Sequence, residues 1–206
     1  MRVAPSSPPD RNARRALRSE LRSRRRGLAP LFRERAARLV AHHLDREFHL
    51  RPGLRIAAYA SMAEELDTAP LIALARRRGC RIFLPRVSRR TGRIRFVESL
   101  AGGRERLNHL GIVEPHGSRP ASARWLDLVI APLVAFDDRG VRLGMGGGYY
   151  DRTFAFRNIH SSWRRPLLVG VAYALQQLPS IEAAAHDVRL DAVITEQGVV
   201  RCRTGS

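Results

Sequence analysis

The sequence predicts an α/β architecture with a mostly parallel β-sheet, preceded by a basic helical segment. After Pro52-Gly53, short apolar runs alternate with helical segments, as in strands joined by helical crossovers. The runs Leu126 to Ala131 and Leu167 to Ala172 are almost continuously apolar, which is typical of strands buried on both faces of a parallel sheet. A chain of 206 residues can form one sizeable core or two small ones. No linker divides it, so we expect a flexible tail at 1–10 and a single domain at 11–206.

The N-terminal quarter is helical and strongly basic. The segment Asn12 to Gly27 carries Leu17 and Leu21 among seven arginines, and apolar residues recur at helical spacing from Ala29 to Phe48. Up to Arg51 the chain has 14 arginines and 5 acidic residues, so half of the formal net charge of +18 lies there. The other elements expected are a helix at 69–78, a hairpin through Gly198, and strands at 55–61, 81–87, 94–98, 126–131, 167–172 and 192–195.

The basic residues exclude several chemistries, because all 37 of them are arginine and none is lysine. The chain therefore has no Schiff-base lysine, no lysine general base and no Walker A loop. Any phosphate bound here must be held by guanidinium groups, backbone amides or a metal ion. Phosphate chemistry, if present, depends on arginine.

Composition also restricts where the protein acts. No apolar run approaches the ~20 residues that a membrane span needs, because Asp and Arg interrupt every one. The first ten residues, MRVAPSSPPD, lack the apolar segment of a secretory signal, so we expect a cytoplasmic protein. Cys80 and Cys202 resemble neither a metal cluster nor a disulfide framework, and we expect them to be ordinary packing or surface residues.

The densest chemical signal is the segment DDRGVRLGMGGGYYDR at 137–152, which follows the apolar run LDLVIAPLVAF. Four glycines within Gly144–Gly148, before a helix expected to begin near Tyr149, predict a loop whose amides can turn towards an anion. Arg142 before the loop and Asp151 after it supply a phosphate ligand and a candidate magnesium ligand. The loop matches neither the dinucleotide fingerprint nor a Walker loop, and a plain glycine turn is the simpler alternative.

A second polar segment, His186-Asp187, lies between two of the expected strands. Carboxylates near strand ends often face the ligand crevice of an α/β sheet, so Asp187 could share a magnesium ion with Asp151. A surface loop with a capping aspartate would explain the pair equally well.

A third polar segment, YASMAEELDT at 59–68, follows the first expected strand. One of its carboxylates could accept hydrogen bonds from an amino-substituted heterocycle, and we favour Glu65 for this role. For Asp67 and Thr68 we expect the simpler role, that of capping the helix that follows.

These segments, in this order, resemble the 5-formyltetrahydrofolate cyclo-ligase family, also called 5,10-methenyltetrahydrofolate synthetase. The resemblance runs from RRALRSELRSRRRGL through YASMAEELDT and RLGMGGGYYDR to HDVRLDAVITE, which is almost the whole chain. It implies a three-layer α/β/α Rossmann-like sandwich and an enzyme that uses ATP and Mg²⁺. In the family, ATP phosphorylates the formyl oxygen of 5-formyltetrahydrofolate. The neighbouring amine nitrogen then attacks the activated carbon, and phosphate leaves to give 5,10-methenyltetrahydrofolate and ADP.

Carried over position by position, the resemblance implies four groups of site residues. Arg142 and Tyr150 would be catalytic, and Asp151 with Asp187 would hold magnesium. The folate substrate would contact Ala60, Glu65, Met145, Gly146, Gly147, Gly148 and Tyr149. ATP would contact Arg14, Arg18, Arg142, Leu143, Gly144, Met145, Gly146, Gly147, Gly148, Tyr149 and Tyr150.

Three positions depart from the family's pattern. Arg14 stands where lysine is usual, and Gly147 stands where some members carry lysine. The acidic residue that commonly comes just before His-Asp is absent. Either Glu182 reaches the site from further away or that role is missing. A paralogue with the same fold and another metabolite as substrate is therefore an alternative.

A basic RNA-binding protein is the alternative from a different class. The net charge of +18 and the arginine-rich first helix would neutralise several phosphates without sequence preference. Aromatic residues make up only 6% of the chain, and the basic clusters are not interleaved with them as a stacking surface requires. We therefore expect 5-formyltetrahydrofolate and ATP as partners, no specific nucleic acid, no membrane, and a monomer.

Overall fold

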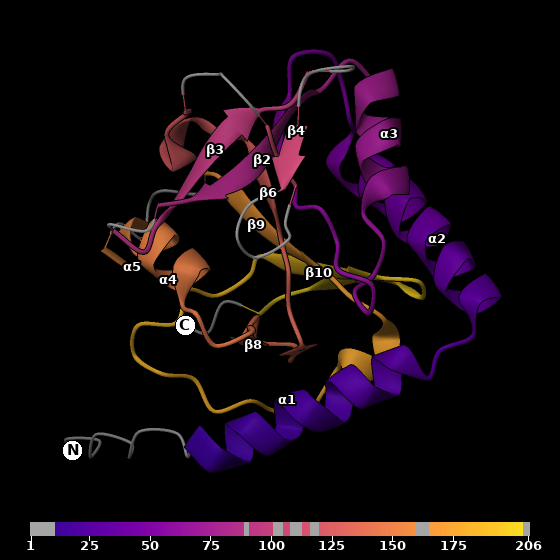
Figure 1. The fold of residues 1–206 in the computed structure, drawn as a ribbon, viewed down its shortest axis with the longest axis vertical. Coiled ribbons are helices and arrows are strands. Elements are labelled where there is room, and N and C mark those ends of the chain that lie inside the picture. The colour runs from indigo at the N-terminus through magenta and orange to yellow at the C-terminus, as the bar shows by residue number, and fades with distance from the viewer. Residues whose placement is uncertain are drawn as a thin grey trace.

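The computed structural model describes residues 11–88, 91–100, 105–107, 113–115, 120–159 and 165–203 (Figure 1). The predicted tail at 1–10 lies outside the described residues. The described part forms the predicted α/β architecture, with a mostly parallel sheet at its centre.

The central sheet has seven strands. In spatial order they are β11 (Gly198–Arg201), β10 (Ala192–Thr195), β9 (Leu167–Val171), β6 (Leu128–Ala131), β1 (Arg55–Ala57), β2 (Arg81–Val87) and β3 (Ile94–Glu98). The five inner strands run parallel, and the edge strands β3 and β11 pair antiparallel with their neighbours. All four residues of β6 are buried, which explains why its sequence is continuously apolar. Two small hairpins complete the strands: β4 (Glu105–Leu107) with β5 (Val113–Pro115), and β7 (Ala135–Phe136) with β8 (Arg142–Leu143).

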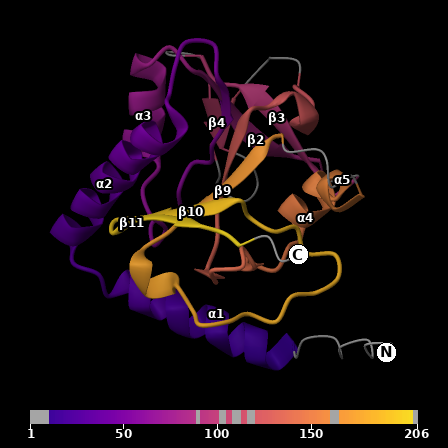
Figure 2. The same ribbon diagram turned by 180° about the vertical axis from the view of Figure 1, so that it is seen from behind.

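Helices cover both faces of the sheet, and one helix crosses its end (Figures 1 and 2). They are α1 (Arg11–Arg26), α2 (Pro30–Phe48), α3 (Ala69–Arg77), α4 (Tyr149–Phe154) and α5 (Phe156–Ile159), with 3₁₀ turns η1 (Ala123–Trp125) and η2 (Ala174–Gln176). On one face, Leu44 of α2 and Leu71 of α3 pack onto the sheet, and on the other face Phe154 of α4 does so. These are the three expected layers. Among the described residues, no helix is long and apolar enough to span a membrane.

Most predicted elements form where expected, but the strand predicted at 126–131 begins at Leu128, the hairpin of β4 and β5 was not predicted, and other elements differ as follows. The strand predicted at 55–61 ends at Ala57, because the chain leaves the sheet after the amide of Ala58 binds the carbonyl of Phe83. The helix predicted to begin at Tyr149 has only six residues before a second short helix follows. The hairpin of β7 and β8 was not predicted, since two-residue strands have no detectable period. Both cysteines are free thiols within or against the apolar clusters, as expected of packing residues.

One buried carboxylate, that of Asp127, joins the beginnings of three parallel strands. Its two oxygens accept hydrogen bonds from Nε and Nη2 of Arg55, each at 2.8 Å, and from the backbone amide of Arg55 at 3.0 Å. Arg165, just before β9, adds a bond of 2.8 Å. The hydrogen bonds from Arg55 are the main reason why the pKa of Asp127 falls to about 2.

Replacing this carboxylate by an amide, in Asp127→Asn, should destabilise the fold by about 1–3 kcal/mol at neutral pH. Because the folded-state pKa lies below the ordinary 3.8, the ionised group stabilises the fold fully above about pH 4. That contribution is lost as the pH falls towards 2. Urea unfolding of both proteins should therefore show a larger difference near pH 6 than near pH 3. The exposed Glu34→Gln is the matched control and should change little at either pH. If the difference in unfolding free energy between Asp127→Asn and the unmodified protein stays the same at pH 3, this account is wrong.

Candidate functional site

The candidate site lies at the carboxyl ends of β1 and β6, where the order of the strands reverses. From β1 the chain continues to β2 on one side, and it later returns to β6 on the other side. Such reversal points are the usual ligand crevices of open α/β sheets. Helix α1 packs across this end, where Leu21 contacts Val134 and Leu143 (Figure 2). The site is therefore built from the loops after β1 and β6 together with α1.

The glycine loop between β8 and α4 follows a path that glycine allows. Gly146 and Gly148 have φ angles of 100° and 61°, in the left-handed region that L side chains avoid. A Cβ atom on Gly147 would lie 2.5 Å from the ring of Tyr149. The backbone path therefore favours glycine at 146 and 148, and the Tyr149 ring leaves no room for a side chain at 147.

Two arginines hold the carbonyl groups of the glycine loop. Nε of Arg18, from α1, donates to the carbonyl of Gly144 at 2.8 Å, and Nη2 of Arg152, from α4, donates to that of Gly147 at 2.6 Å. The amides of Met145–Gly148 make no hydrogen bond to another described residue. Because these amides have no partner among the described residues, they remain available to an anion. The amides and arginines must supply most of the attraction, since a helix as short as α4 has a weak dipole.

Arg14 and Arg18 lie one turn apart on α1 and bring three distant segments together. Arg14 donates to the carbonyl of Glu182, and its Nη2 lies 3.5 Å from Oδ2 of Asp187. Burial and the neighbouring charge of Arg14 both lower the pKa of Arg18. Two cations held this close favour an anionic ligand beside them.

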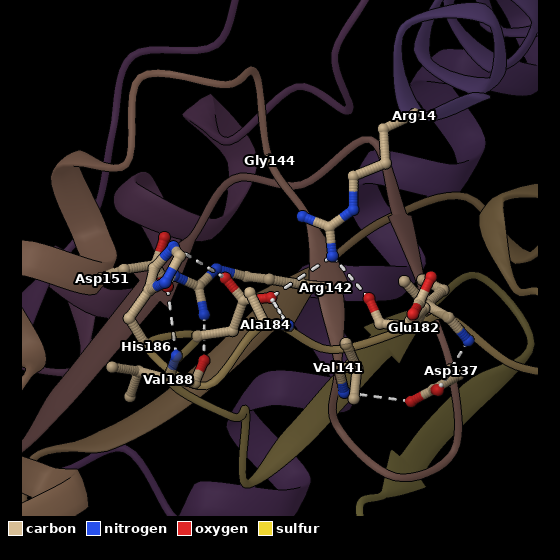
Figure 3. Close-up of polar contacts among 12 residues, drawn as sticks. Arg14, Asp137, Val141, Arg142, Gly144, Asp151, Glu182, Ala184, His186 and Val188 are labelled. Carbon is tan, nitrogen blue, oxygen red and sulfur yellow. Dashed lines mark hydrogen bonds and ion pairs between the residues drawn. The ribbon is translucent and has the colours of Figure 1, made fainter. Parts of the chain in front are cut away.

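Arg142 is buried and links the predicted metal ligand Asp151 to the loop before β10 (Figure 3). Its Nη2 donates to Oδ1 of Asp151 at 2.6 Å, and its Nη1 donates to the carbonyl of Val188. Oδ1 of Asp151 also accepts the amide of Val188 at 3.1 Å. The guanidinium predicted to bind phosphate is thus already paired with a carboxylate.

The predicted metal ligands Asp151 and Asp187 lie in neighbouring segments, joined through Val188. Oδ2 of Asp187 accepts the amide of Ala184 at 2.9 Å, and within the described residues no third Asp, Glu, His or Cys completes a metal cluster. Two carboxylates are a usual protein contribution to a magnesium site whose other ligands are phosphate oxygens and water. The donor set therefore fits magnesium shared with a bound phosphate. Glu182 takes part through its carbonyl, which binds Arg14.

Glu65 lies on the opposite side of the candidate site, and only 7% of its surface is exposed. Its Oε2 accepts the amide of Met62 at 2.9 Å, and its own carbonyl accepts hydrogen bonds from Arg33 and Tyr173. Burial raises the pKa of Glu65. Ala60, also predicted to contact substrate, is half-buried on the same loop.

Asp67 binds the start of α3 as expected, but the side chain of Thr68 does not cap that helix. Oδ1 of Asp67 accepts the amide of Ala69 at the start of α3, and Oγ1 of Thr68 donates to the carbonyl of Tyr59 at 2.5 Å. They thereby fix the loop that carries Glu65.

Tyr150 lies between the glycine loop and Glu65 and packs against Phe154. Burial raises its pKa well above the ordinary value of 10.0, and the charge of Glu65 adds to that shift. Tyr150 therefore keeps its proton near neutral pH and offers a neutral hydroxyl, which can donate a hydrogen bond but cannot act as a base.

Sequence reasoning missed three charged residues of this site. Arg22 binds Glu64 through Nε at 2.9 Å, and Arg25 lies 4.0 Å from the same oxygen. Burial would raise the pKa of Glu64, but the hydrogen bonds from Arg22 lower it overall. Arg25 follows Leu21 by one helical turn, so the apolar face of α1 was the signal that would have placed it inside.

Comparison with known proteins gives concordant matches over most of the chain. A sequence model of the 5-formyltetrahydrofolate cyclo-ligase family matches residues 10–196. The 5-formyltetrahydrofolate cyclo-ligase of Escherichia coli K12 is 34% identical over 184 residues, covering 87% of this chain and 98% of that protein. The mouse 5-formyltetrahydrofolate cyclo-ligase is 29% identical over 192 residues, covering 90% and 94%. The NMR structure of Aquifex aeolicus 5,10-methenyltetrahydrofolate synthetase is 28% identical, with a TM-score of 0.76 and 94% of each chain covered. The chain therefore belongs to the 5-formyltetrahydrofolate cyclo-ligase family.

Proposed function

We propose that this protein is an ATP-dependent ligase that cyclises 5-formyltetrahydrofolate to 5,10-methenyltetrahydrofolate, with release of ADP and phosphate. The observation that carries the proposal is the convergence of two different halves in one crevice. One half has Arg14 and Arg18 beside the unpaired amides of Met145–Gly148, which suits a polyphosphate. The other half has the buried carboxylate of Glu65, which suits the N–H donors of a pterin. Membership of the family supports the same activity.

The proposed reaction needs positioning and charge neutralisation more than covalent help from the protein. The formyl oxygen attacks the γ-phosphorus of ATP, and the bond from that phosphorus to ADP breaks. The neighbouring amine nitrogen then attacks the formyl carbon and gives up its proton, and the C–O bond to phosphate breaks. Arg18 and the glycine loop would hold the phosphates in line, and Glu65 would hold the pterin so that its formyl group faces them.

The predicted catalytic residues would act by orientation in this scheme. Arg142 uses two of its N–H donors for Asp151 and Val188, so its remaining donors would reach the transferred phosphoryl group. Tyr150, kept neutral by burial, would donate its hydroxyl proton in a hydrogen bond to the substrate. Met145 and Tyr149 would line the folate beside the glycines.

We propose that Asp151 and Asp187 hold Mg²⁺ together with phosphate oxygens of ATP. The bound ion would neutralise charge on the transferred phosphoryl group. The salt bridge to Arg142 orients Asp151, while its second oxygen makes no hydrogen bond to a described residue.

We further propose that one chain forms the whole site, so that the monomer is active and small molecules are its partners. Four arginines of α1 point inward onto described partners of the same chain: Arg14, Arg18, Arg22 and Arg25. That use of the basic helix supports a small-molecule site over a specific nucleic-acid surface, which would need those side chains facing solvent.

The decisive experiment follows the near-ultraviolet absorbance of methenyltetrahydrofolate with purified protein, 5-formyltetrahydrofolate and magnesium, with and without ATP. An increase that depends on ATP, with one ADP formed per product, is the expected result. If the folded protein binds ATP but gives no increase in absorbance, the substrate is another metabolite, as the paralogue alternative states.

Removing one phosphate-facing guanidinium, in Arg18→Met, should raise the KM for ATP by about 10- to 100-fold, because a charge-assisted hydrogen bond is lost. The KM for 5-formyltetrahydrofolate should change far less. Arg15→Met, on the exposed side of the same helix, removes the same charge and is the control. Steady-state kinetics of both variants provide the measurement. Equal effects of the two substitutions would place the nucleotide elsewhere.

Neutralising a proposed metal ligand, in Asp151→Asn, should raise the magnesium concentration for half-maximal activity by about tenfold. Activity should recover in part at high magnesium, because Asp187 remains. Asp138→Asn, in the turn between β7 and β8, is the control and should leave the titration unchanged. An unchanged magnesium titration for Asp151→Asn would remove this residue from the metal shell.

A further inference from the structure

Arg25, near the end of α1, is a buried guanidinium whose hydrogen-bonding capacity is only partly used. The residue is 1% exposed. Its Nη1 donates to the carbonyl of Leu133 at 3.3 Å. Nε and Nη2 are both buried, and neither donates a hydrogen bond within the described part of the chain. Buried donors without acceptors are rare because leaving them unpaired is costly, so an acceptor that is not part of this chain is the natural explanation.

The guanidinium lies at the reversal point of the sheet. Leu133 follows β6, while Tyr59 and Glu65, whose charges act on the pKa of Arg25, follow β1. Burial lowers the pKa of Arg25, and the negative charges of Glu65 and Glu64 oppose that change. Nη2 of Arg25 lies 4.0 Å from Oε1 of Glu64, so the donor-rich Arg25 lies beside the loop that carries the acceptor Glu65.

Two protein oxygens near Arg25 already have other partners. Oε1 of Glu64 accepts two hydrogen bonds from Arg22 and lies 4.0 Å from Nη2 of Arg25. The carbonyl of Leu133 also accepts Nε2 of Gln176 at 3.1 Å. Neither oxygen accepts a hydrogen bond from Nε or Nη2 of Arg25.

We propose that Arg25 is a further substrate-binding residue, whose Nε–H and Nη2–H bind the ring carbonyl oxygen of the pterin beside the N–H groups held by Glu65. The inference rests on the proposed function. One edge of a pterin presents an amino group, a ring N–H and a carbonyl oxygen in sequence. A carboxylate accepts from the two donors, and an adjacent guanidinium donates to the third group. A site built in this way rejects an analogue that lacks the acceptor, because its buried donors then stay unpaired.

The test compares the binding of two ligands by isothermal titration calorimetry. One is 5-formyltetrahydrofolate, and the other is its analogue with an amino group in place of the ring carbonyl. In Arg25→Met, the Kd of the carbonyl compound should rise about 10- to 100-fold, while that of the amino analogue should change little. Arg24→Met is the matched control, since Arg24 carries the same charge on the same turn with 59% of its side chain exposed. The Arg24→Met variant should keep the unmodified protein's preference for the carbonyl compound over the amino analogue.

Two further variants keep the result interpretable. Arg25→Lys retains the buried charge without the planar pair of donors, so a reduced preference in this variant supports the proposal even if Arg25→Met does not fold. Glu65→Gln should weaken both ligands. If the Arg25 variants fold and lose both ligands equally, Arg25 merely docks α1 and the proposal is overturned. If the unmodified protein binds neither ligand, the proposed function itself fails, and this inference fails with it.

Discussion

Hydrogen bonds from guanidinium groups to main-chain carbonyls hold α1 across the carboxyl ends of the central strands. Arg14 binds Glu182, Arg18 binds Gly144, and Arg25 binds Leu133. These carbonyls come from three loops that are far apart in sequence. Each bond engages a carbonyl oxygen with a charged donor, which is stronger than a neutral pair. In the glycine loop the amides of Met145–Gly148 have no partner among the described residues. The anion binding proposed for the loop would therefore depend on α1 as much as on its glycines.

Charge is separated within the crevice. The side formed by α1 and the glycine loop is cationic, and burial next to Arg14 already lowers the pKa of Arg18. The side that follows β1 holds Glu65 in a buried environment that raises its pKa. Neutral Tyr150 lies between the two. A polyanion therefore suits the side of Arg14 and Arg18, and a heterocycle that donates hydrogen bonds suits the side of Glu65, where Arg22 and Arg25 offset the carboxylate charge.

The sequence was most informative where one residue type was enforced by the backbone. Gly146 and Gly148 could be identified because a left-handed backbone admits few other residues, and the run at 128–131 could be identified because both faces of β6 are buried. Periodicity also places Arg14 and Arg18 on one face of α1, but it does not name their partners. The pairing of Arg142 with Asp151 depends on how α4 meets the loop before β10. Tertiary contacts of this kind leave no periodic signal in the sequence. For the same reason the sequence did not distinguish the buried Arg25 from Arg24 and Arg26 beside it.

The absence of lysine becomes intelligible from the same geometry. The three donors of a lysine ammonium all lie on one nitrogen atom. A lysine whose nitrogen binds a loop carbonyl would therefore hold that nitrogen where a phosphate would also need it. A guanidinium spreads five donors over a plane. Arg18 uses Nε to bind the carbonyl of Gly144. Its terminal nitrogens lie close to Gly146, within 4 Å of the position that a Cβ atom on that glycine would occupy. One edge of the group fixes the loop, and the other edge stays open towards its amides. Replacement of the usual lysine by Arg14 works in the same way, because Arg14 holds the carbonyl of Glu182 and keeps donors for an anion. Arginine at these positions would therefore combine the docking of α1 with the phosphate binding that we propose, in single side chains.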